Sequence, residues 1–309
     1  MDKFLNIAQV IAPILAAVAL GIIARRRELM TDREVRGLQQ FVMKFGLPCV
    51  IFNSCLTADI GAESLTSMVL VIPSVLFGTL WAFRARKKSL PYHNLPQLFT
   101  AQETGMLGIP LFMILFGADQ AYRMGVLDLA QAVTAYPTIA ILSAATEENP
   151  SPKAIAKSVL TSPLLIMSAL GLTLNISGLG AWLDGIGIRS VITECTGFLG
   201  QPISALMIFA VGYNFSLEKD NRGTIFRISA GHFLYFGLWG LAIQGILFLI
   251  PNMDSQTRWA TLMYCTLPAS YLAPTLGRDQ KDFTMASGVC SLLTIPALIV
   301  FCIIAIFVS

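Results

Sequence analysis

Two runs of Gly, Pro and polar residues stand inside apolar segments of the chain and bring groups that could bind a solute. The first, QETGMLGIP at 102–110, contains the carboxyl group of Glu103, and the second is TLPASYLAP at 266–274. Proline removes a backbone donor and clashes with the carbonyl one turn earlier, so Pro110 and Pro268 predict broken helices. The N-terminus of a half-helix presents amide hydrogens and a positive dipole end to an anion. We therefore predict an anion-accepting site where the two breaks cross.

Glu103 is the residue of this predicted site with the widest choice of roles. If its segment crosses a membrane, a carboxyl group there is costly and is a functional-site hypothesis by default. Glu103 could bind a coupling H⁺ or Na⁺, donate a hydrogen bond to a substrate when neutral, or repel an anion when ionised. Alternatively, it reaches interfacial water or pairs with Lys44, whose long stem could instead extend to the interface. Coupling by Glu103 is the sharper of these hypotheses.

Other polar residues and glycines are candidates for the same site. Gly105 and Gly108 let a ligand or another backbone approach closely. Asp128 and Gln131 share a helix face at helical spacing, which predicts either a cavity-lining stripe or interhelical hydrogen bonds. The predicted substrate-binding residues are Glu103, Thr104, Gly105, Gly108, Pro110, Gln131, Tyr136, Pro268 and Ser270. The predicted coupling or secondary residues are Glu103, Asp128, Lys44, Asn53, Gln201 and Ser204.

The composition indicates the solvent that surrounds these residues. Hydrophobic residues make up 55% of the 309 residues, charged residues make up 13%, and the mean hydropathy is +0.69. These values are too apolar for a soluble domain, so we predict an all-α polytopic membrane protein. The first apolar run, near 4–24, is long enough to be a retained transmembrane helix rather than a cleaved signal peptide. The six cysteines stand singly, which argues against a disulfide framework or a zinc site.

Apolar runs bounded by polar breaks predict ten spans, at 4–24, 39–56, 65–83, 95–116, 123–145, 157–176, 192–213, 225–250, 257–276 and 283–308. Sixteen Arg and Lys residues fall in the connections after the odd-numbered spans, four fall on the other side, and Lys44 lies inside a span. Because cytoplasmic connections are enriched in Arg and Lys, we predict that both termini lie outside. This topology accounts for the net charge of +3, which therefore indicates no nucleic-acid partner.

An internal repeat accompanies the ten predicted spans. The pattern Pro-x5-Ala-Leu-Gly occurs in each half of the chain and ends at Gly21 and at Gly171. The later prolines keep their order and similar spacing, with Pro48, Pro110 and Pro137 in the first half and Pro202, Pro268 and Pro296 in the second. Because each half has an odd number of spans, we predict an inverted repeat of 1–145 and 146–309. Spans four and nine are its broken, crossing pair.

Five short motifs stand in order along the chain: Pro48 with Phe52, Gly108-Ile109-Pro110-Leu111, Gln131 followed five residues later by Tyr136, Pro268, and Ile295-Pro296. Together they resemble the auxin efflux carrier family, which includes plant PIN proteins and bacterial malonate or malate permeases. The resemblance covers essentially the whole chain. It implies a scaffold domain from spans one, two, six and seven, and a transport domain from spans three to five and eight to ten. It also implies an elevator-like carriage of small organic anions around crossed helices four and nine, as in the NhaA and bile-acid-symporter arrangement, and a homodimer through the scaffold.

Two departures from the plant members of this family are informative. The connection near 146–157 is short, which favours a prokaryotic member in the cytoplasmic membrane. Plant members commonly carry Asn where this chain has Glu103. An ionised carboxylate would repel an anion, so the charge of the substrate stays open.

The sequence therefore predicts a secondary transporter in a lipid bilayer for a small carboxylate-containing solute, with no cofactor beyond a coupling H⁺ or Na⁺. The alternative is a proton- or sodium-coupled carrier of a neutral or cationic metabolite. Enzyme classes are disfavoured because the chain has no Gly-x-Ser-x-Gly elbow, no His-Glu-x-x-His and no phosphate-cradling loop. A channel would need a pore line rather than two broken helices, and we predict neither catalytic residues nor a metal site.

Overall fold

The computed structural model describes residues 2–58, 61–88, 92–144, 161, 163–215, 221–271, 273–277 and 279–308. In the first half the elements are α1 (Asp2–Arg26), α2 (Asp32–Phe41), the π-helical turn η1 (Val42–Gly46), α3 (Leu47–Thr57), α4 (Ala62–Lys88), the 3₁₀ turn η2 (Pro96–Phe99), the π-helical turn η3 (Thr104–Gly108), α5 (Ile109–Phe116), η4 (Ala118–Gln120) and α6 (Ala121–Ala144). In the second half they are α8 (Pro163–Ile176), α9 (Leu179–Gly185), α10 (Ile188–Gly200), α11 (Ile203–Asn214), α12 (Arg222–Leu249), α13 (Ser255–Thr266), η5 (Ala273–Leu276) and α14 (Gln280–Val308). Every named element in these ranges is helical, as predicted.

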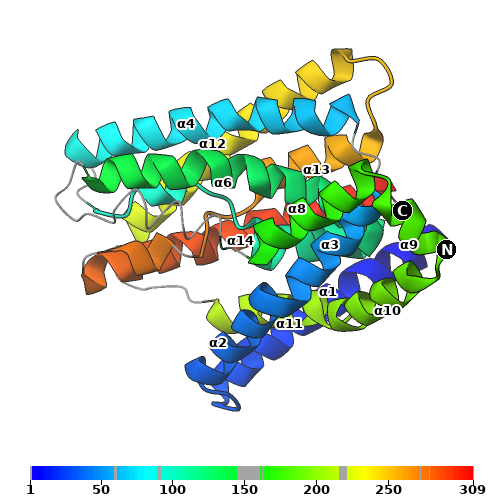
Figure 1. The fold of residues 1–309 in the computed structure, drawn as a ribbon. Helices are drawn as coiled ribbons and strands as arrows, with labels where there is room; N and C mark the ends of the chain where they lie inside the picture. The colour runs from blue at the N-terminus through cyan, green and yellow to red at the C-terminus, as the bar shows by residue number, and fades with distance from the viewer. Residues whose placement is uncertain are drawn as a thin grey trace.

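Four helical segments are long and apolar enough to cross a membrane, by the described residues alone: Ala62–Ala85, Ile188–Asn214, Arg222–Leu249 and Gln280–Val308. Two shorter apolar helices, Thr104–Phe116 and Ile166–Ile176, accompany them. These segments support a helical membrane protein, while the count of ten spans stays a prediction. The marked ends of the chain lie at the same end of the molecule (Figure 1).

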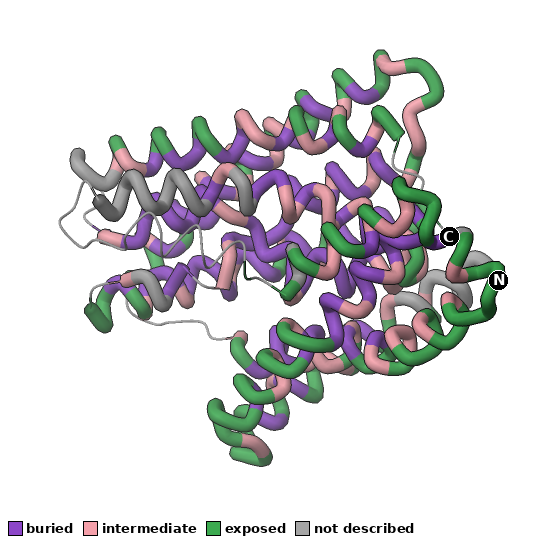
Figure 2. The backbone as a smooth tube through the Cα atoms, in the orientation of Figure 1, coloured by how far each residue is buried: buried purple, intermediate pink, exposed green. Residues whose placement is uncertain are grey.

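Large apolar side chains cover much of the outer surface. On α12 the exposed positions include Phe226, Leu234, Leu238, Leu241 and Phe248, while the inward positions hold buried residues. Figure 2 shows buried residues concentrated in the interior, with exposed ones along the outer helices. An apolar exterior of this extent would be unstable in water and matches contact with lipid chains.

The helices pack in two groups (Figure 1). One group contains α4, α6, α12, α13 and α14, and the other contains α1, α2, α3, α8, α10 and α11. The short helix α5 and its preceding turn η3 lie between the groups, because they contact both α6 and α11. The broken segment thus stands where the two groups meet.

Two glycines allow close helix contacts within the second group. A Cβ at Gly21 in α1 would lie 2.1 Å from the carbonyl oxygen of Phe209 in α11. A Cβ at Gly171 in α8 would lie 2.6 Å from the carbonyl oxygen of Phe52 in α3. Both glycines are the final residue of the repeated Pro-x5-Ala-Leu-Gly pattern. Both sites exclude any larger residue, because the backbone atoms that they face cannot move aside.

Helix α2 begins with a capping box that fixes the segment leading toward the crossing. The Thr31 hydroxyl accepts from the Glu34 backbone N–H at 3.3 Å, and the Glu34 carboxylate accepts from the Thr31 backbone N–H at 2.7 Å. These bonds favour the ionised carboxylate and lower the pKa of Glu34. The exposed Arg36 follows on the same helix.

The first break lies earlier in the chain than Pro110. Backbone from Ala101 to Glu103 is non-helical, and the helix that begins at Thr104 runs through Pro110 to Phe116 by way of the η3 turn. Pro110 follows directly after the π-helical turn η3, and the helical path continues through it into α5. In the other segment the helix does end at the predicted place, because α13 stops at Thr266, just before Pro268.

Two further differences from the predicted spans concern the second half. The segment predicted at 192–213 falls within Ile188–Asn214, where α10 and α11 follow one another with a turn at Gln201 and Pro202 between them. The helix α9 was not predicted. The start of the span predicted at 157–176 lies mostly outside the described residues, and α8 begins at Pro163.

Candidate functional site

The two breaks pair side by side through one isolated antiparallel β-bridge, between Gln102 and Ala269. The backbone N–H of Glu103 donates to the carbonyl of Pro268 at 2.8 Å, and the N–H of Ser270 donates to the carbonyl of Ala101 at 2.9 Å. In hydrocarbon, free backbone groups must find partners inside the protein. Each break therefore supplies hydrogen-bond partners for some of the backbone groups that the other break leaves free.

Gln131 of α6 completes this pairing from the other side. Its side-chain oxygen accepts from the Gln102 backbone N–H at 2.9 Å, and its nitrogen donates to the Gln102 carbonyl at 3.0 Å. The Tyr264 hydroxyl donates to the same Gln131 oxygen at 3.0 Å. The Gln102 side-chain amide, with its nitrogen toward the second break, donates to the carbonyls of Leu267 and Pro268, each at 3.1 Å. The structure thus uses Gln131 for interhelical bonding, one of the two roles predicted from its spacing.

The carboxylate of Glu103 links the two breaks by hydrogen bonds. Its side chain is 5% exposed, and one carboxylate oxygen accepts from the Met106 backbone N–H at 3.1 Å, capping the half-helix that follows. The other oxygen accepts from the Tyr271 backbone N–H at 2.6 Å, and the Ser270 side chain also hydrogen-bonds the carboxylate. Lys44 is exposed, and no ion pair joins it to Glu103 among the described side chains.

Asp128 and Thr104 form a second polar contact at the first break. The Thr104 hydroxyl donates to an Asp128 carboxylate oxygen, and the Gln131 side-chain nitrogen approaches the same oxygen at 3.0 Å. That nitrogen also lies 3.0 Å from the Thr104 hydroxyl oxygen. The structure therefore brings Thr104, Asp128 and Gln131 together beside Glu103.

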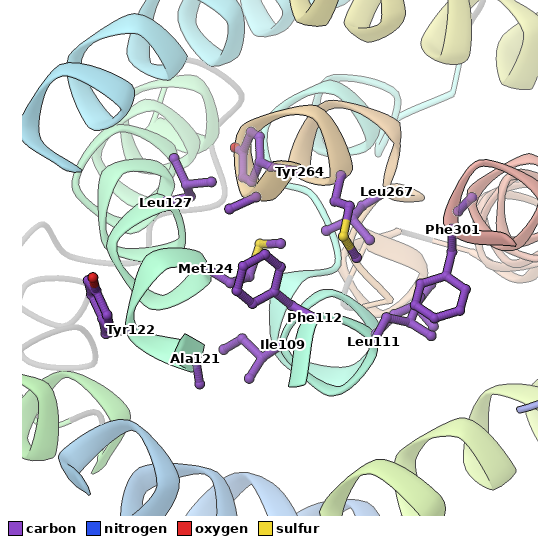
Figure 3. Close-up of a cluster of buried hydrophobic side chains, with 14 of the residues drawn as sticks. Ile109, Leu111, Phe112, Ala121, Tyr122, Met124, Leu127, Tyr264, Leu267 and Phe301 are labelled. Atoms are coloured by element: carbon purple, nitrogen blue, oxygen red, sulfur yellow. The ribbon is translucent and has the colours of Figure 1, made fainter. Parts of the chain in front are cut away.

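The half-helix after the first break packs tightly on the second break. A Cβ at Gly108 would lie 2.6 Å from a Leu267 methyl carbon, and one at Gly105 would lie 3.1 Å from the Met43 methyl carbon. Figure 3 shows apolar side chains of α5, α6 and α14 gathered around this half-helix, with Phe112 near Met124 and Leu267. This packing surrounds the half-helix with buried apolar side chains.

A polar cavity of about 330 Å³ opens beside the crossing. Its lining includes Arg25, Asp32, Arg36 and Gln39 from α1 and α2, together with Met106 and Tyr271 from the two breaks. The Gln39 side chain reaches the Met106 sulfur at 3.4 Å. The Arg25 guanidinium donates to the Tyr213 carbonyl at 3.1 Å, which fixes its position at the rim. We call this space the arginine cavity.

A second cavity, of about 450 Å³, lies at the other end of α5. It is lined by Met113 of α5 and by three of the predicted secondary residues, Asn53, Gln201 and Ser204. The Ser204 hydroxyl donates to the Pro110 carbonyl at 3.3 Å, and the Asn53 amide donates to the Thr193 carbonyl at 3.3 Å. These residues are thus separate from the Glu103 cluster. We call this space the amide cavity.

Some functional candidates were missed, and one cannot be placed. Arg25 and Arg36 were counted only as topology signals, because in the sequence they lie between the first two apolar runs, far from either break. Gln102 stands next to Glu103 and was not singled out. The Tyr136 side chain lies outside the described residues. Among the described residues, no group of three or more His, Cys, Asp or Glu side chains could hold a metal ion.

The fold and composition define a helical membrane protein with two broken segments that cross in its interior. No protein-family model matches the chain. The chain is similar to an uncharacterized transporter of Methanothermobacter thermautotrophicus, with 22% identity over 306 residues that cover 96% of each protein. This similarity supports a membrane location and a membrane transporter rather than an enzyme.

Proposed function

We propose that the chain is a secondary transporter that carries a small organic anion, such as a carboxylate, across a prokaryotic cytoplasmic membrane. The observation that carries this proposal is the arginine cavity, which places two guanidinium groups beside the crossing of two broken segments. Broken helices that meet in the interior are typical of transporter binding sites. The similarity to a transporter along nearly the whole chain supports the same class.

The charges and size of the arginine cavity favour a small anion. The two positive charges of Arg25 and Arg36 outnumber the single negative charge of Asp32, so the lining has an excess of positive charge. Guanidinium groups bind carboxylates through paired hydrogen bonds. The volume of about 330 Å³ is at the low end of the range for small-molecule sites.

Glu103 changes where the anion should bind. Its carboxylate already occupies the N-terminus of the half-helix that begins at Thr104, which is where sequence analysis placed the anion. A second negative charge at that point would be repelled. We therefore place the substrate on the arginine side of the crossing, against Met106 and Tyr271.

The packing of the helices supports an alternating-access motion of the elevator type. The α5 half-helix lies between two helix groups, with the arginine cavity at its start and the amide cavity at its end. We propose that the group containing α4, α6, α12, α13 and α14 moves with the crossing, while the group containing α1, α3, α8 and α11 serves as the scaffold. This division, the homodimer, the outward termini and membership of the auxin efflux carrier family belong to the proposal.

Uptake into proteoliposomes tests the proposal directly. Liposomes containing the full chain should accumulate labelled malonate, malate or an auxin-like acid when pH and sodium gradients are varied. Arg36→Gln should lower the apparent affinity about tenfold because one charge-assisted contact is lost. Arg33→Gln, on the same helix but outside the cavity lining, is the matched control and should retain normal affinity. Failure to take up any acid of the panel would overturn the proposal.

The alternative is a proton- or sodium-coupled carrier of a neutral or cationic metabolite. The buried carboxyl group of Glu103 and the half-buried one of Asp128 favour it, since a cation would be attracted there. Uptake of neutral or cationic solutes by the same liposomes, with the acids inert, would support this alternative.

A further inference from the structure

A groove of about 420 Å³ lies between the two groups of helices, apart from the crossing. Its walls come from α1 and α11 of one group and from α14 of the other. The helix α1 packs along α11 and also touches α14, so the three helices are neighbours. A ligand in this groove would therefore contact both groups at once.

The lining of the groove is suited to hydrocarbon. Leu15 of α1 and Ile299 and Ile306 of α14 all line it, and each is about half exposed. Thr294 brings a hydroxyl to the lining, but that hydroxyl donates to the Cys290 carbonyl at 2.9 Å and also contacts the Tyr271 hydroxyl at 2.8 Å. The described lining therefore favours an apolar chain over a polar ligand.

The length of the groove matches one acyl chain. The helix α14 lines it from Thr294 to Ile306, a distance of about 18 Å at about 1.5 Å per residue. The hydrocarbon core of a bilayer is about 30 Å thick, so one leaflet contributes about 15 Å. An acyl chain of a single leaflet can therefore lie along the whole groove.

A positive charge stands beyond one end of the groove. Leu15, Val18 and Ile22 of α1 line the groove at helical spacing, so they share one face of that helix. Arg26 follows Ile22 by one helical turn and continues the same face. Its side chain is exposed, and among the described side chains no ion pair involves it. The groove face of α1 thus ends in a guanidinium group that is open to a ligand.

The two arginines on either side of Arg26 are placed differently. The Arg25 guanidinium donates to the Tyr213 carbonyl at 3.1 Å and lines the arginine cavity. The Arg27 backbone N–H donates to the Ile23 carbonyl at 2.8 Å, which extends the helical path to this residue. Arg27 then lies roughly 140° around the helix from the groove face, at 3.6 residues per turn. Arg26 is therefore the arginine of the three that best suits a ligand in the groove.

A membrane phospholipid combines the two chemical features that the groove and Arg26 require. Its acyl chain is apolar, and its phosphate group forms charge-assisted hydrogen bonds with guanidinium groups. Basic side chains at the cytoplasmic end of a transmembrane helix attract anionic lipids in particular. A small soluble anion has no chain to fill the groove, and a neutral lipid gains less from the positive charge.

We propose that the groove binds one acyl chain of an anionic phospholipid and that Arg26 binds its phosphate group. The lipid contacts α1 and α11 on one side and α14 on the other, so it joins the two helix groups. Val211, Phe215 and Thr294 line both the groove and the arginine cavity, so the lipid lies next to the proposed substrate site without occupying it. The proposal does not rest on the transport function.

Native mass spectrometry of the delipidated full chain in detergent tests the charged part of this site. Dioleoyl phosphatidylglycerol should bind about fivefold more tightly than dioleoyl phosphatidylcholine, which has the same chains but no net charge. Arg26→Gln should weaken the binding of phosphatidylglycerol about tenfold, because a charge-assisted contact is lost. Arg27→Gln is the matched control, with the same chemical change off the groove face, and should bind this lipid normally.

A second pair of variants tests the apolar part of the site. Ile299→Trp fills the groove from an exposed position of α14, so it should weaken the binding of both phospholipids. Leu241→Trp introduces the same side chain at an exposed position of α12 outside the groove lining. This control should leave the binding of both phospholipids unchanged.

The outcomes that contradict the proposal are distinct. Equal affinities for the two phospholipids, or equal losses in Arg26→Gln and Arg27→Gln, would overturn the role of Arg26. Displacement of phosphatidylglycerol by an equal concentration of glycerol 3-phosphate would overturn the role of the chain. If Arg26→Gln does not fold, Ile299→Trp decides, and unchanged binding in that variant contradicts the proposal. These measurements contain no transported anion, so a failure of anion uptake would not alter them.

Discussion

The first break contributes side chains to the crossing, whereas the second contributes mainly backbone. Glu103 and Thr104 reach out from the first break to Tyr271 and Asp128 through their own side chains. The second break contributes the Pro268 carbonyl and the backbone N–H groups of Ser270 and Tyr271, with one side chain, that of Ser270, on Glu103. The two breaks therefore bond to each other by different groups, side chains in the first and mainly backbone in the second. Side-chain substitutions should lower the stability of the protein more in the first break than in the second.

Glu103→Ala should show the largest effect on stability. Removing the carboxylate leaves the buried N–H groups of Met106 and Tyr271 without their acceptors, at a cost of about 3 kcal/mol. Thermal unfolding of the purified protein in detergent measures this loss. The matched change in the second break, Ser270→Ala, should lower the melting temperature much less. Equal losses in the two variants would remove the difference between the breaks.

Gln131→Met should have the second-largest effect on stability. The substitution keeps the length of the side chain but deletes both contacts to the Gln102 backbone, for an expected loss of about 2 kcal/mol. The control is Gln201→Met, the same chemical change at an exposed position, which should leave the unfolding temperature nearly unaltered. An unchanged melting temperature in Gln131→Met would show that the first break does not depend on the hydrogen bonds from Gln131 of α6.

Gly108→Ala should have the smallest effect of the three, because a flexible side chain stands in the way rather than backbone. Its Cβ would meet a Leu267 methyl carbon at 2.6 Å, so overpacking should cost about 1 kcal/mol. Leu267→Ala in the same chain should cancel part of that cost. A double-mutant cycle by thermal unfolding measures this coupling, and strictly additive losses would argue against direct contact between the two positions.

The sequence predicted the residues of the crossing better than it predicted their arrangement. Helical spacing placed Asp128 and Gln131 on one face, and the structure brings both to Thr104. Pro110 misled the placement of the first break, because the non-helical backbone lies at 101–103 and the helical path from Thr104 continues through the proline. Pairing of the two breaks depends on contacts between distant segments, which no local pattern encodes.

The arginine cavity shows a second limit of sequence analysis. Arg25 and Arg36 belong to a connection rich in positive charge, and topology alone explains such residues. Only the packing of α1 and α2 beside the second break shows that these two line a cavity with Tyr271. The membrane class was easier to predict, because the composition of the chain is too apolar for a soluble domain.

The comparison of two matched hydroxyl deletions tests the account most directly. Thr104→Val and Ser270→Ala each remove one hydroxyl, from the first and the second break respectively. The melting temperature of the purified protein in detergent should fall clearly in Thr104→Val, since the Thr104 hydroxyl bonds both Asp128 and Gln131. Ser270→Ala should stay closer to the wild-type melting temperature. Equal reductions, or a larger loss in Ser270→Ala, would contradict the claim that the side chains of the first break hold the crossing together.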